Sequence, residues 1–271
     1  MSYFRDSVLE NNGKRYKMGW IDTHCHLNDD TYDTEIQQLL ERALEANVER
    51  MIVVGYDLPS SEKALHLAEQ YPSIYAVVGI HPSESHTFDV YTREKLVKLV
   101  MHDKVVGIGE IGLDYYWDEN PPAETQRTVF LEQLHLAWEV GKPVIIHTRD
   151  AAQETYDILK EEQGITGVMH CYSGSYEMAA RFVQLGYYIS LAGPVTFKNA
   201  VAPKEVASKI PLDHLLIETD CPYLTPHPYR GKRNEPSYVM HVGQEVARLR
   251  NLEETELMQA LERNAKKLFK F

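Results

Sequence analysis

The stretch Trp20-Ile21-Asp22-Thr23-His24-Cys25-His26 determines how the rest of this chain is interpreted. A short apolar run ends here in two histidines that stand two positions apart. Side chains two positions apart on a β-strand point to the same side, so both imidazoles can reach one metal ion if the strand end faces a cavity. Neutral imidazole is a common ligand of divalent metals near neutral pH. Alone, such a pair belongs to ordinary surface more often than to a metal site.

Seven more short apolar runs follow this first strand and alternate with amphipathic segments. The further strands are expected at 51–55, 75–80, from 105–108 onward, 143–146, 167–169, 187–191 and 215–217. The helices are expected at 32–48, behind a cap at Ser60 or Ser61, and at 95–101, 124–140, around 156–159, 176–185, 201–210 and 236–271, the last broken near Asn251. Apolar strands that alternate with helices pair in parallel through right-handed crossovers. Eight such units predict an α/β fold, a (β/α)8 TIM barrel.

The alternative to a barrel is an open, doubly wound parallel sheet. Sheets of that kind bind nucleotides at a strand–helix turn with the pattern Gly-x-Gly-x-x-Gly. No strand–helix turn of this sequence has the pattern. We therefore favour the barrel and expect no nucleotide cofactor.

Length and composition describe one globular domain. The chain has 271 residues, of which 44% are hydrophobic and 25% charged, and barrels run to about 250 residues as one domain. We expect residues 18–271 to form a single catalytic domain. Residues 1–17 mix charges with no hydrophobic region, so they are interpreted as a poorly ordered extension and not as a secretory signal. No apolar stretch approaches the ~18 residues that cross a bilayer, and no membrane partner is expected.

Cysteine count and net charge bear on the compartment and the partners. Cys25, Cys171 and Cys221 make an odd number without zinc-ribbon spacing, which argues against a disulfide framework and fits a reducing cytoplasm. Strand alternation predicts that each points away from the neighbouring candidate ligand. The net charge of −12 argues against a broad basic face for nucleic acid, but it permits a local grip on a strand end. We expect a monomer or a weak oligomer.

Metal-binding residue types recur where the expected strands end. In chain order they are His24, His26, His81, Glu110, His147, His170 and Asp220. Barrels build active sites at the carboxyl ends of their strands, so these side chains are expected to face one cavity. With His81 left aside, four histidines, a glutamate and an aspartate outnumber the three or four protein ligands that one catalytic metal takes. The count predicts two divalent metal ions, with Zn, Mn, Mg, Fe and Ni as candidates.

Strand order divides these residues between two ions. The two histidines of the first strand are expected to bind the same ion, joined by Asp220 from the strand that closes the barrel. His147 and His170 come from neighbouring strands and would hold the second ion. Glu110 lies between the groups and can bridge both ions with its two oxygens. Asp220 could also serve as general base for an attacking water, so Asp220 and Glu110 are the expected catalytic residues.

Five segments of the chain carry distinctive motifs. They are Asp22-Thr23-His24-Cys25-His26-Leu27, Gly109-Glu110-Ile111-Gly112-Leu113-Asp114-Tyr115-Tyr116, His147-Thr148-Arg149-Asp150, His170-Cys171-Tyr172-Ser173-Gly174 and Glu218-Thr219-Asp220-Cys221-Pro222-Tyr223-Leu224. In this order they resemble the TatD family of metal-dependent deoxyribonucleases, within the amidohydrolase superfamily. The resemblance extends over roughly residues 18–271. It implies a (β/α)8 barrel, a divalent metal centre and phosphodiester hydrolysis, often as an exonuclease on DNA.

The resemblance also implies a ligand set that agrees with the grouping by strand order. The family's ligand positions fall on His24, His26, Glu110, His147, His170 and Asp220. Other two-metal members of the superfamily often bridge their ions with a carboxylated lysine. Glu110 stands in that place here, so no modified lysine is needed. The first seventeen residues have no counterpart in the family pattern.

A basic loop follows the last expected strand. Arg230, Lys232 and Arg233 concentrate positive charge within residues 226–235 of an acidic chain, and family members carry a similar loop. These side chains are predicted to bind DNA by clamping its backbone phosphate at the mouth of the site. The alternative is an ordinary solvated surface run.

Two further residues are predicted to bind substrate. Arg149 stands two positions beyond His147 on the same face and could reach a phosphate or pair with a carboxylate. His81 could donate a hydrogen bond to substrate or position a water. Residues 115–117 are all aromatic and are equally suited to stacking on a base or to covering the core.

The expected function is that of a metal-dependent hydrolase that cleaves phosphodiester bonds of DNA, a TatD-type deoxyribonuclease acting as a 3'-5' exonuclease. The alternative is hydrolysis of an ester or amide bond in a small molecule, because the same ions polarise carbonyls. The basic loop distinguishes the two activities, because hydrolysis of a neutral amide does not need it whereas binding of DNA does. A third class is a binding protein with a structural metal. Structural sites are closed and have four ligands, whereas six candidates in a barrel mouth imply open positions.

Overall fold

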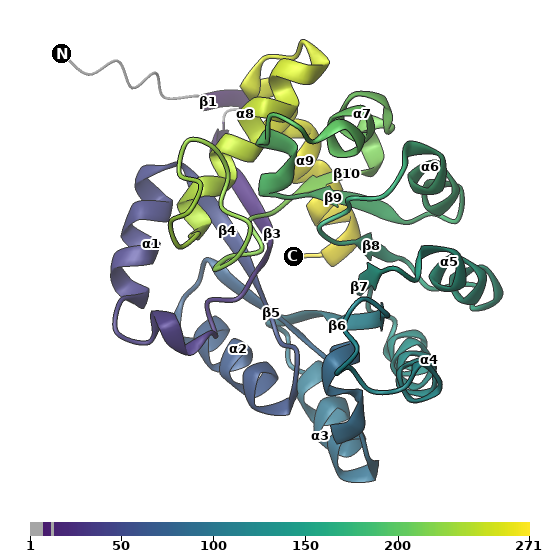
Figure 1. The fold of residues 1–271 in the computed structure, drawn as a ribbon. Coiled ribbons are helices and arrows are strands. Elements are labelled where there is room, and N and C mark those ends of the chain that lie inside the picture. The colour runs from purple at the N-terminus through teal and green to yellow at the C-terminus, as the bar shows by residue number, and fades with distance from the viewer. Residues whose placement is uncertain (1–7, 12–13) are drawn as a thin grey trace.

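A computed structural model describes residues 8–11 and 14–271 of the chain. Eight parallel strands form one sheet in the order β3 to β10 and curve into a barrel with helices around it (Figure 1). The strands are β3 (Trp20–Cys25), β4 (Val48–Val54), β5 (Ile74–Val78), β6 (Val105–Asp114), β7 (Val144–Arg149), β8 (Gly167–Met169), β9 (Tyr188–Leu191) and β10 (Leu215–Ile217). The (β/α)8 barrel predicted from the sequence is confirmed.

The helices follow the strands as the sequence predicts, with shifted ends. They are α1 (Ile36–Glu45), α2 (Leu58–Gln70), α3 (Val90–Val100), α4 (Ala123–Val140), α5 (Ala152–Glu161), α6 (Tyr176–Gln184), α7 (Val201–Lys209), α8 (Val239–Arg250) and α9 (Glu254–Phe269). Asn251 ends α8 in the left-handed conformation, with φ of 53°, which confirms the predicted break. The prediction that Ser60 or Ser61 caps α2 is wrong, because the Asp57 side chain accepts the capping bond and Ser60 completes a capping box.

Hydrogen bonds between the first and last strands bring the barrel close to closure. The backbone N–H of Asp220 donates to the carbonyl of His24, and the N–H of His26 donates to that of Cys221, both over 2.9 Å. The buried carboxylate of Asp22 adds a third link, since its Oδ1 accepts from the backbone N–H of Thr219 over 2.9 Å. This seam joins the ends of β3 and β10, where three of the predicted ligands lie.

Two apolar layers hold the barrel together. The inner layer takes residues from every barrel strand, among them Ile21, Val106 and Leu216, together with Leu268 and Phe269 from the end of α9. The last turn of α9 therefore fills the amino-terminal end of the barrel, and the chain ends near the barrel axis in Figure 1. The outer layer packs the other strand faces against the helices. Because apolar side chains fill the amino-terminal end of the barrel, the cavity for polar chemistry lies at the carboxyl ends of the strands.

The segment before the barrel forms two short strands. β1 (Val8–Asn11) and β2 (Lys14–Lys17) pair antiparallel, as a sheet separate from the barrel. The predicted extension of residues 1–17 thus includes paired strands where it is described, and its remaining residues, 1–7 and 12–13, lie outside the described part. Among the helices of the described residues, none has the length and apolarity needed to cross a bilayer.

Candidate metal centre

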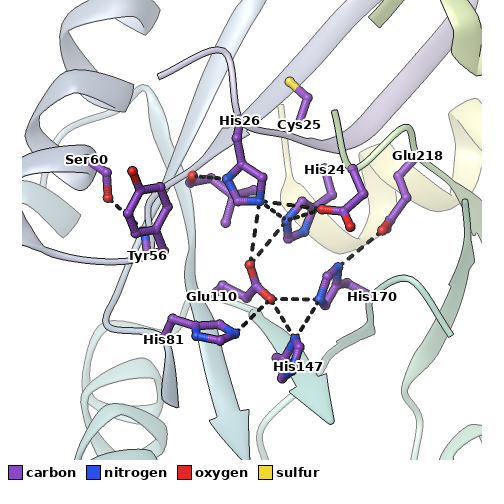
Figure 2. Close-up of polar contacts among 12 residues, drawn as sticks. His24, Cys25, His26, Tyr56, Ser60, His81, Glu110, His147, His170 and Glu218 are labelled. Carbon is purple, nitrogen blue, oxygen red and sulfur yellow. Dashed lines mark hydrogen bonds and ion pairs between the residues drawn. The ribbon is translucent and has the colours of Figure 1, made fainter. Parts of the chain in front are cut away.

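Six predicted ligands converge on one cavity at the carboxyl ends of the barrel strands. Figure 2 shows five of them, from β3, β6, β7 and the end of β8, turned toward a common centre around Glu110. The cavity has a volume of about 640 Å³ and is lined by five of the six ligands, His24 lying behind them, fully buried. The six are His24, His26, Glu110, His147, His170 and Asp220.

The first group of ligands lies at the seam between β3 and β10. The Nε2 atoms of His24 and His26 are 3.1 Å apart. Asp220 Oδ1 lies 3.7 Å from the first of these nitrogens and 3.5 Å from the second. A bulge in the pairing of β3 with β4, between Asp22 and Cys25, lies next to both histidines. These three side chains form one cluster able to hold a metal ion.

The second group lies across the cavity, on β6, β7 and the end of β8. Oε1 of Glu110 is 2.9 Å from His147 Nδ1 and 2.8 Å from His170 Nε2, and the two nitrogens are 3.2 Å apart. The other oxygen, Oε2, faces the first group at 3.4 Å from His24 Nε2 and 3.7 Å from His26 Nε2. The Glu110 carboxylate thus presents one oxygen to His24 and His26 and the other to His147 and His170. A ligand that bridges two metal ions has this arrangement.

Hydrogen bonds behind the histidines fix which ring nitrogen faces the cavity. His26 Nδ1 lies 2.9 Å from the carbonyl oxygen of Val54, so it carries the proton and leaves Nε2 as a lone pair. His170 Nδ1 faces Glu218 Oε1 at 3.2 Å, and His147 Nε2 faces Asp114 Oδ2 at 3.1 Å. In each neutral ring, the nitrogen that faces the cavity is therefore the unprotonated one.

These lone pairs meet carboxylate oxygens that have no proton to give. Nitrogen and oxygen acceptors that converge over about 3 Å repel one another unless a proton or a metal cation lies among them. The donor set, four imidazoles and two carboxylates, suits borderline divalent ions. On both counts the residues fit a centre of one or two divalent metal ions.

The electrostatics of the cavity favour positive charge at its centre. Burial raises the pKa of Glu110, but the neighbouring His170 and the hydrogen bonds from His147 and His170 outweigh it and hold that pKa well below its usual range. For Asp220 the effect of burial is likewise exceeded by the hydrogen bond to His26, and its pKa is lowered. Burial opposes a charge on His26, yet Asp220 and Glu110 raise its pKa to about 9, so without a metal ion the ring binds a proton in the place that a cation would take. Both carboxylates are therefore ionised at neutral pH and attract cations.

Local backbone geometry places Glu110 and Asp220. The strand β6 continues four residues past Glu110, and at Gly112 it runs so close to β7 that a Cβ atom there would lie 1.9 Å from the His147 carbonyl oxygen. Gly112 also has φ of +143°, which side chains disfavour. Asp220 adopts φ of 55°, an uncommon value that turns the chain out of β10 and brings its carboxylate beside the β3 histidines.

His81 lies at the edge of the centre as a hydrogen-bond donor. Its Nδ1 accepts from the backbone N–H of Ser83 over 3.1 Å, so the proton sits on Nε2. That nitrogen points into the cavity, 3.6 Å from Glu110 Oε1. Burial and the nearby His147 lower the pKa of His81 to about 3, which keeps the ring neutral.

Arg149 lines the cavity beside two exposed aromatic rings. Its guanidinium lies 3.7 Å from the centroid of the Tyr116 ring and 5.2 Å from that of Trp117, and Trp117 also lines the cavity. Tyr115 differs, because it is partly buried and its hydroxyl donates to Glu154 over 3.0 Å. Of the three aromatic residues considered for stacking, Tyr116 and Trp117 are thus available and Tyr115 is held in the structure.

The side chains of the basic loop make their contacts outside the cavity, whereas Arg149 lines it. Arg233 forms an ion pair with Glu35 over 2.7 Å and donates to the carbonyl of Thr31 over 2.6 Å. The Arg230 guanidinium stacks on the Phe197 ring at 3.7 Å, and Lys232 lies 5.4 Å from the centroid of Tyr229. Within the described residues that line the cavity, Arg149 is the one lysine or arginine.

Two carboxylates of the site were given no role from the sequence. Asp114 and Glu218 stand behind His147 and His170, respectively, and both are buried. Both belong to motifs described above from the sequence. Asp114 stands four residues after Glu110, and Glu218 stands two residues before Asp220. Spacing on a strand shows that such a residue shares a face with a ligand, but it does not show which ring it supports.

Two of the three cysteines lie away from the cavity. Cys25 and Cys221 are fully buried in the outer apolar layer, where their sulfurs and a carboxylate oxygen of Asp22 lie within 4.8 Å of one another. All three cysteines are free thiols. Cys25 thus points to the opposite side of β3 from its neighbours His24 and His26, as strand alternation predicts.

Comparison with known proteins identifies the family. The family model described as "TatD related DNase" matches residues 21–270. YabD of Bacillus subtilis, named an uncharacterized metal-dependent hydrolase, is 48% identical over 252 residues, which cover 92% of this chain and 98% of that protein. YcfH of Escherichia coli K12, with the same description, is 37% identical over 254 residues that cover 92% and 95%.

A solved structure agrees with this match. The crystal structure of YjjV from Escherichia coli K12, described as a TatD homolog, has a TM-score of 0.89 and 35% identity to this chain. The similarity covers 93% of this chain and 98% of that one. The chain belongs to the TatD family of metal-dependent hydrolases.

Proposed function

We propose that this protein is a metal-dependent deoxyribonuclease with two divalent ions, which removes nucleotides from a DNA strand in the 3'-5' direction. The observation that carries the proposal is the position of Glu110, which presents one oxygen to the histidine pair of β3 and the other to His147 and His170. A pair of divalent ions supplies Lewis acidity and an activated water to phosphodiester hydrolysis. His24, His26 and Asp220 would hold one ion, His147 and His170 the other, with Glu110 shared.

The chain's own groups supply the proton transfers and the orientation. Asp220 is ionised and borders the cavity, so it is placed to accept a proton from the attacking water. His81 is neutral and directs Nε2–H into the cavity, where it can donate to a phosphate oxygen. Arg149 provides a fixed positive charge at the rim for the next phosphate along the strand.

The shape of the mouth supports a strand end as substrate. Trp117 follows β6 and Tyr223 follows β10, the fourth and eighth strands of the barrel, so the two exposed rings stand on opposite sides of the mouth. Rings in this arrangement can stack on the bases that flank the scissile bond. One cation and two rings around a cavity at the barrel mouth suit the last nucleotides of a single strand better than a long duplex. Three free thiols fit the reducing cytoplasm as the compartment.

The test is degradation of single-stranded DNA labelled at its 5' end. Metal-stripped protein should be inactive, and adding Mn, Mg or Zn should restore a ladder that shortens stepwise from the 3' end. Asp220→Asn, purified in parallel, controls for a contaminating nuclease. Immediate release of the label as a mononucleotide would reverse the polarity, and cleavage equal in the variant would show that this site is not responsible.

A second candidate function is hydrolysis of an ester or amide in a small molecule. The observation in its favour is that the basic loop, predicted to bind DNA, does not line the cavity. A cavity of about 640 Å³ can enclose a small molecule. If metal-loaded protein hydrolyses a model ester or amide but leaves all DNA substrates intact, this candidate replaces the nuclease.

A further inference from the structure

We propose that Glu218 is a positioning residue shared by the two halves of the metal centre, orienting both His24 and His170. The inference rests on the proposed two-ion centre, in which these histidines belong to different ions. It assigns a role to a carboxylate that neither the strand pattern nor the ligand geometry accounts for. Figure 2 shows Glu218 joined to His170, on the side of that ring away from Glu110.

Burial shows that Glu218 needs partners. Its side chain is only 1% exposed, at the end of β10. Its Oε1 lies 3.2 Å from His170 Nδ1, whereas its Oε2 is buried with no hydrogen-bond partner among the described residues. A buried carboxylate oxygen without a donor is rare and points to a donor close by.

The missing donor is found on His24. Its ring is fully buried, and its Nδ1 likewise has no hydrogen-bond partner within the described part of the chain. A nitrogen of His24, a nitrogen of His170 and a carboxylate oxygen of Glu218 all lie within 4.8 Å of one another. The two unpartnered atoms therefore belong to side chains of one buried cluster, and a hydrogen bond between them, direct or through a water, would satisfy both.

The geometry of the His24 and His170 rings is consistent with a shared role for Glu218. The rings of His24 and His170 stack at 4.1 Å between centroids, with planes 16° apart. Both turn Nε2 toward Glu110, at 3.4 Å and 2.8 Å. For both Nε2 atoms to offer lone pairs, both Nδ1 atoms must carry protons, and each proton needs an acceptor. Glu218 has two acceptor oxygens, one for each ring.

Chemistry explains why this position needs a carboxylate. An amide of the same shape has one acceptor oxygen and an NH₂ group that can only donate. Glu218→Gln can therefore support one of the two histidines but must present a donor to the other. That second ring would be driven to protonate Nε2, which removes it as a ligand. Asp114 provides the comparison, because it supports His147 alone.

The test measures metal binding and histidine tautomers, and it does not depend on substrate turnover. Metal-free wild type, Glu218→Gln, Glu218→Leu and Asp114→Asn are titrated with Zn by calorimetry. Nitrogen-15 spectra of the Zn-loaded proteins report which nitrogen of each histidine carries the proton. We expect Glu218→Gln to weaken one ion by about 10–100-fold and change one tautomer, and Glu218→Leu to weaken both ions. Asp114→Asn should weaken one ion and leave the tautomers of His24 and His170 unchanged.

The outcomes distinguish a failure of the role given to Glu218 from a failure of the two-ion centre. Two ions in wild type, with unchanged affinities and tautomers in both Glu218 variants, would overturn the role of Glu218 and leave the centre intact. A lower melting temperature with unchanged ion affinities would show a purely structural role and would also overturn it. Fewer than two ions in wild type would overturn both, and that result is visible without any variant.

Discussion

Oε2 of Glu110 lies 3.4 Å from His24 Nε2, while Oε1 of the same carboxylate turns to the opposite half of the cavity. The two oxygens are held on one rigid carboxyl group, so neither can move without the other. Glu110 itself is 5% exposed and is anchored in the middle of a long strand. The residue therefore fixes the separation between the two ligand clusters, which is the property on which a two-ion reaction depends.

Glu110→Gln should lose paired metal binding. The amide can turn its oxygen to one cluster only and presents an NH₂ group to the other, so one ion is expected to bind at least a hundredfold more weakly. This corresponds to the ~3–5 kcal/mol cost of leaving buried charge without its partner. Calorimetric titration with Mn gives the stoichiometry, and Glu119→Gln, at an exposed position in the loop after β6, is the control. Two tight ions in Glu110→Gln would refute the bridging role.

Asp220→Asn should remove turnover and keep the fold. If the carboxylate accepts the proton of the attacking water, kcat falls by about 10²–10⁴-fold, while the KM for DNA changes little. Steady-state kinetics and a thermal melt check the two parts, with Asp118→Asn in an exposed turn as the control. A kcat within threefold of wild type would remove Asp220 from the reaction.

Arg149→Ala should weaken DNA binding more than loss of the basic loop does. A charge-assisted hydrogen bond to phosphate contributes about 1.5–3 kcal/mol, so the KM should rise about 10–100-fold and the salt dependence should fall by about one phosphate contact. Arg181→Ala is a matched control, because this guanidinium also stacks on a tyrosine, Tyr156, at 3.8 Å, but lies outside the cavity.

The basic loop itself should contribute less, in keeping with its contacts. Replacing both Arg230 and Lys232 by Ala should change the KM for DNA by less than Arg149→Ala does. Arg233→Ala should lower the free energy of unfolding by up to about 1 kcal/mol, as expected for an exposed ion pair with Glu35. Urea denaturation and kinetics at two salt concentrations measure these effects. A larger rise in KM from the loop variants than from Arg149→Ala would contradict this ranking and support the predicted phosphate clamp.

The Arg42–Glu235 ion pair should make stability depend on pH. Burial raises the pKa of Glu235, but its hydrogen bonds to Arg42 and Ser237 outweigh this and lower the pKa below that of the unfolded chain. A carboxyl group with a lowered folded pKa stabilises the protein above the unfolded value of about 4.3, and this stabilisation is lost as the pH falls through the folded pKa.

Glu235→Gln should therefore be less stable than wild type at pH 7, by about 1–3 kcal/mol. The difference should shrink as the pH is lowered below about 4, where wild type loses the same ion pair. Urea denaturation at pH 7 and at pH 3.5 measures both values, with Glu69→Gln at a more exposed site as the control. An equal difference at the two pH values would show that the ion pair does not carry it.

Strand parity and the order of the strands made much of the fold and of the ligand clusters predictable. His24 and His26 share a face because they stand two positions apart, and Glu110 lies between the two clusters because its strand lies between theirs in the barrel. Such relations follow from topology alone, so they can be read before any side chain is placed.

Contacts set by tertiary packing could not be predicted in the same way. Arg233 was expected at the phosphate, but its long side chain reaches Glu35 on the first βα segment, almost two hundred residues earlier. Glu218 lies at a strand end like the ligands, yet it faces the far side of His170, and only the positions of both rings reveal this. Pairings of this kind depend on the rotamers of two distant residues, about which sequence spacing says nothing.

Anomalous diffraction from crystals soaked in Mn is the most direct test for a centre of two ions that share Glu110. We predict two anomalous peaks on either side of the Glu110 carboxylate, one bound by His24, His26 and Asp220 and the other by His147 and His170. A single peak in fully loaded crystals, or a second peak bound outside these residues, would contradict the account.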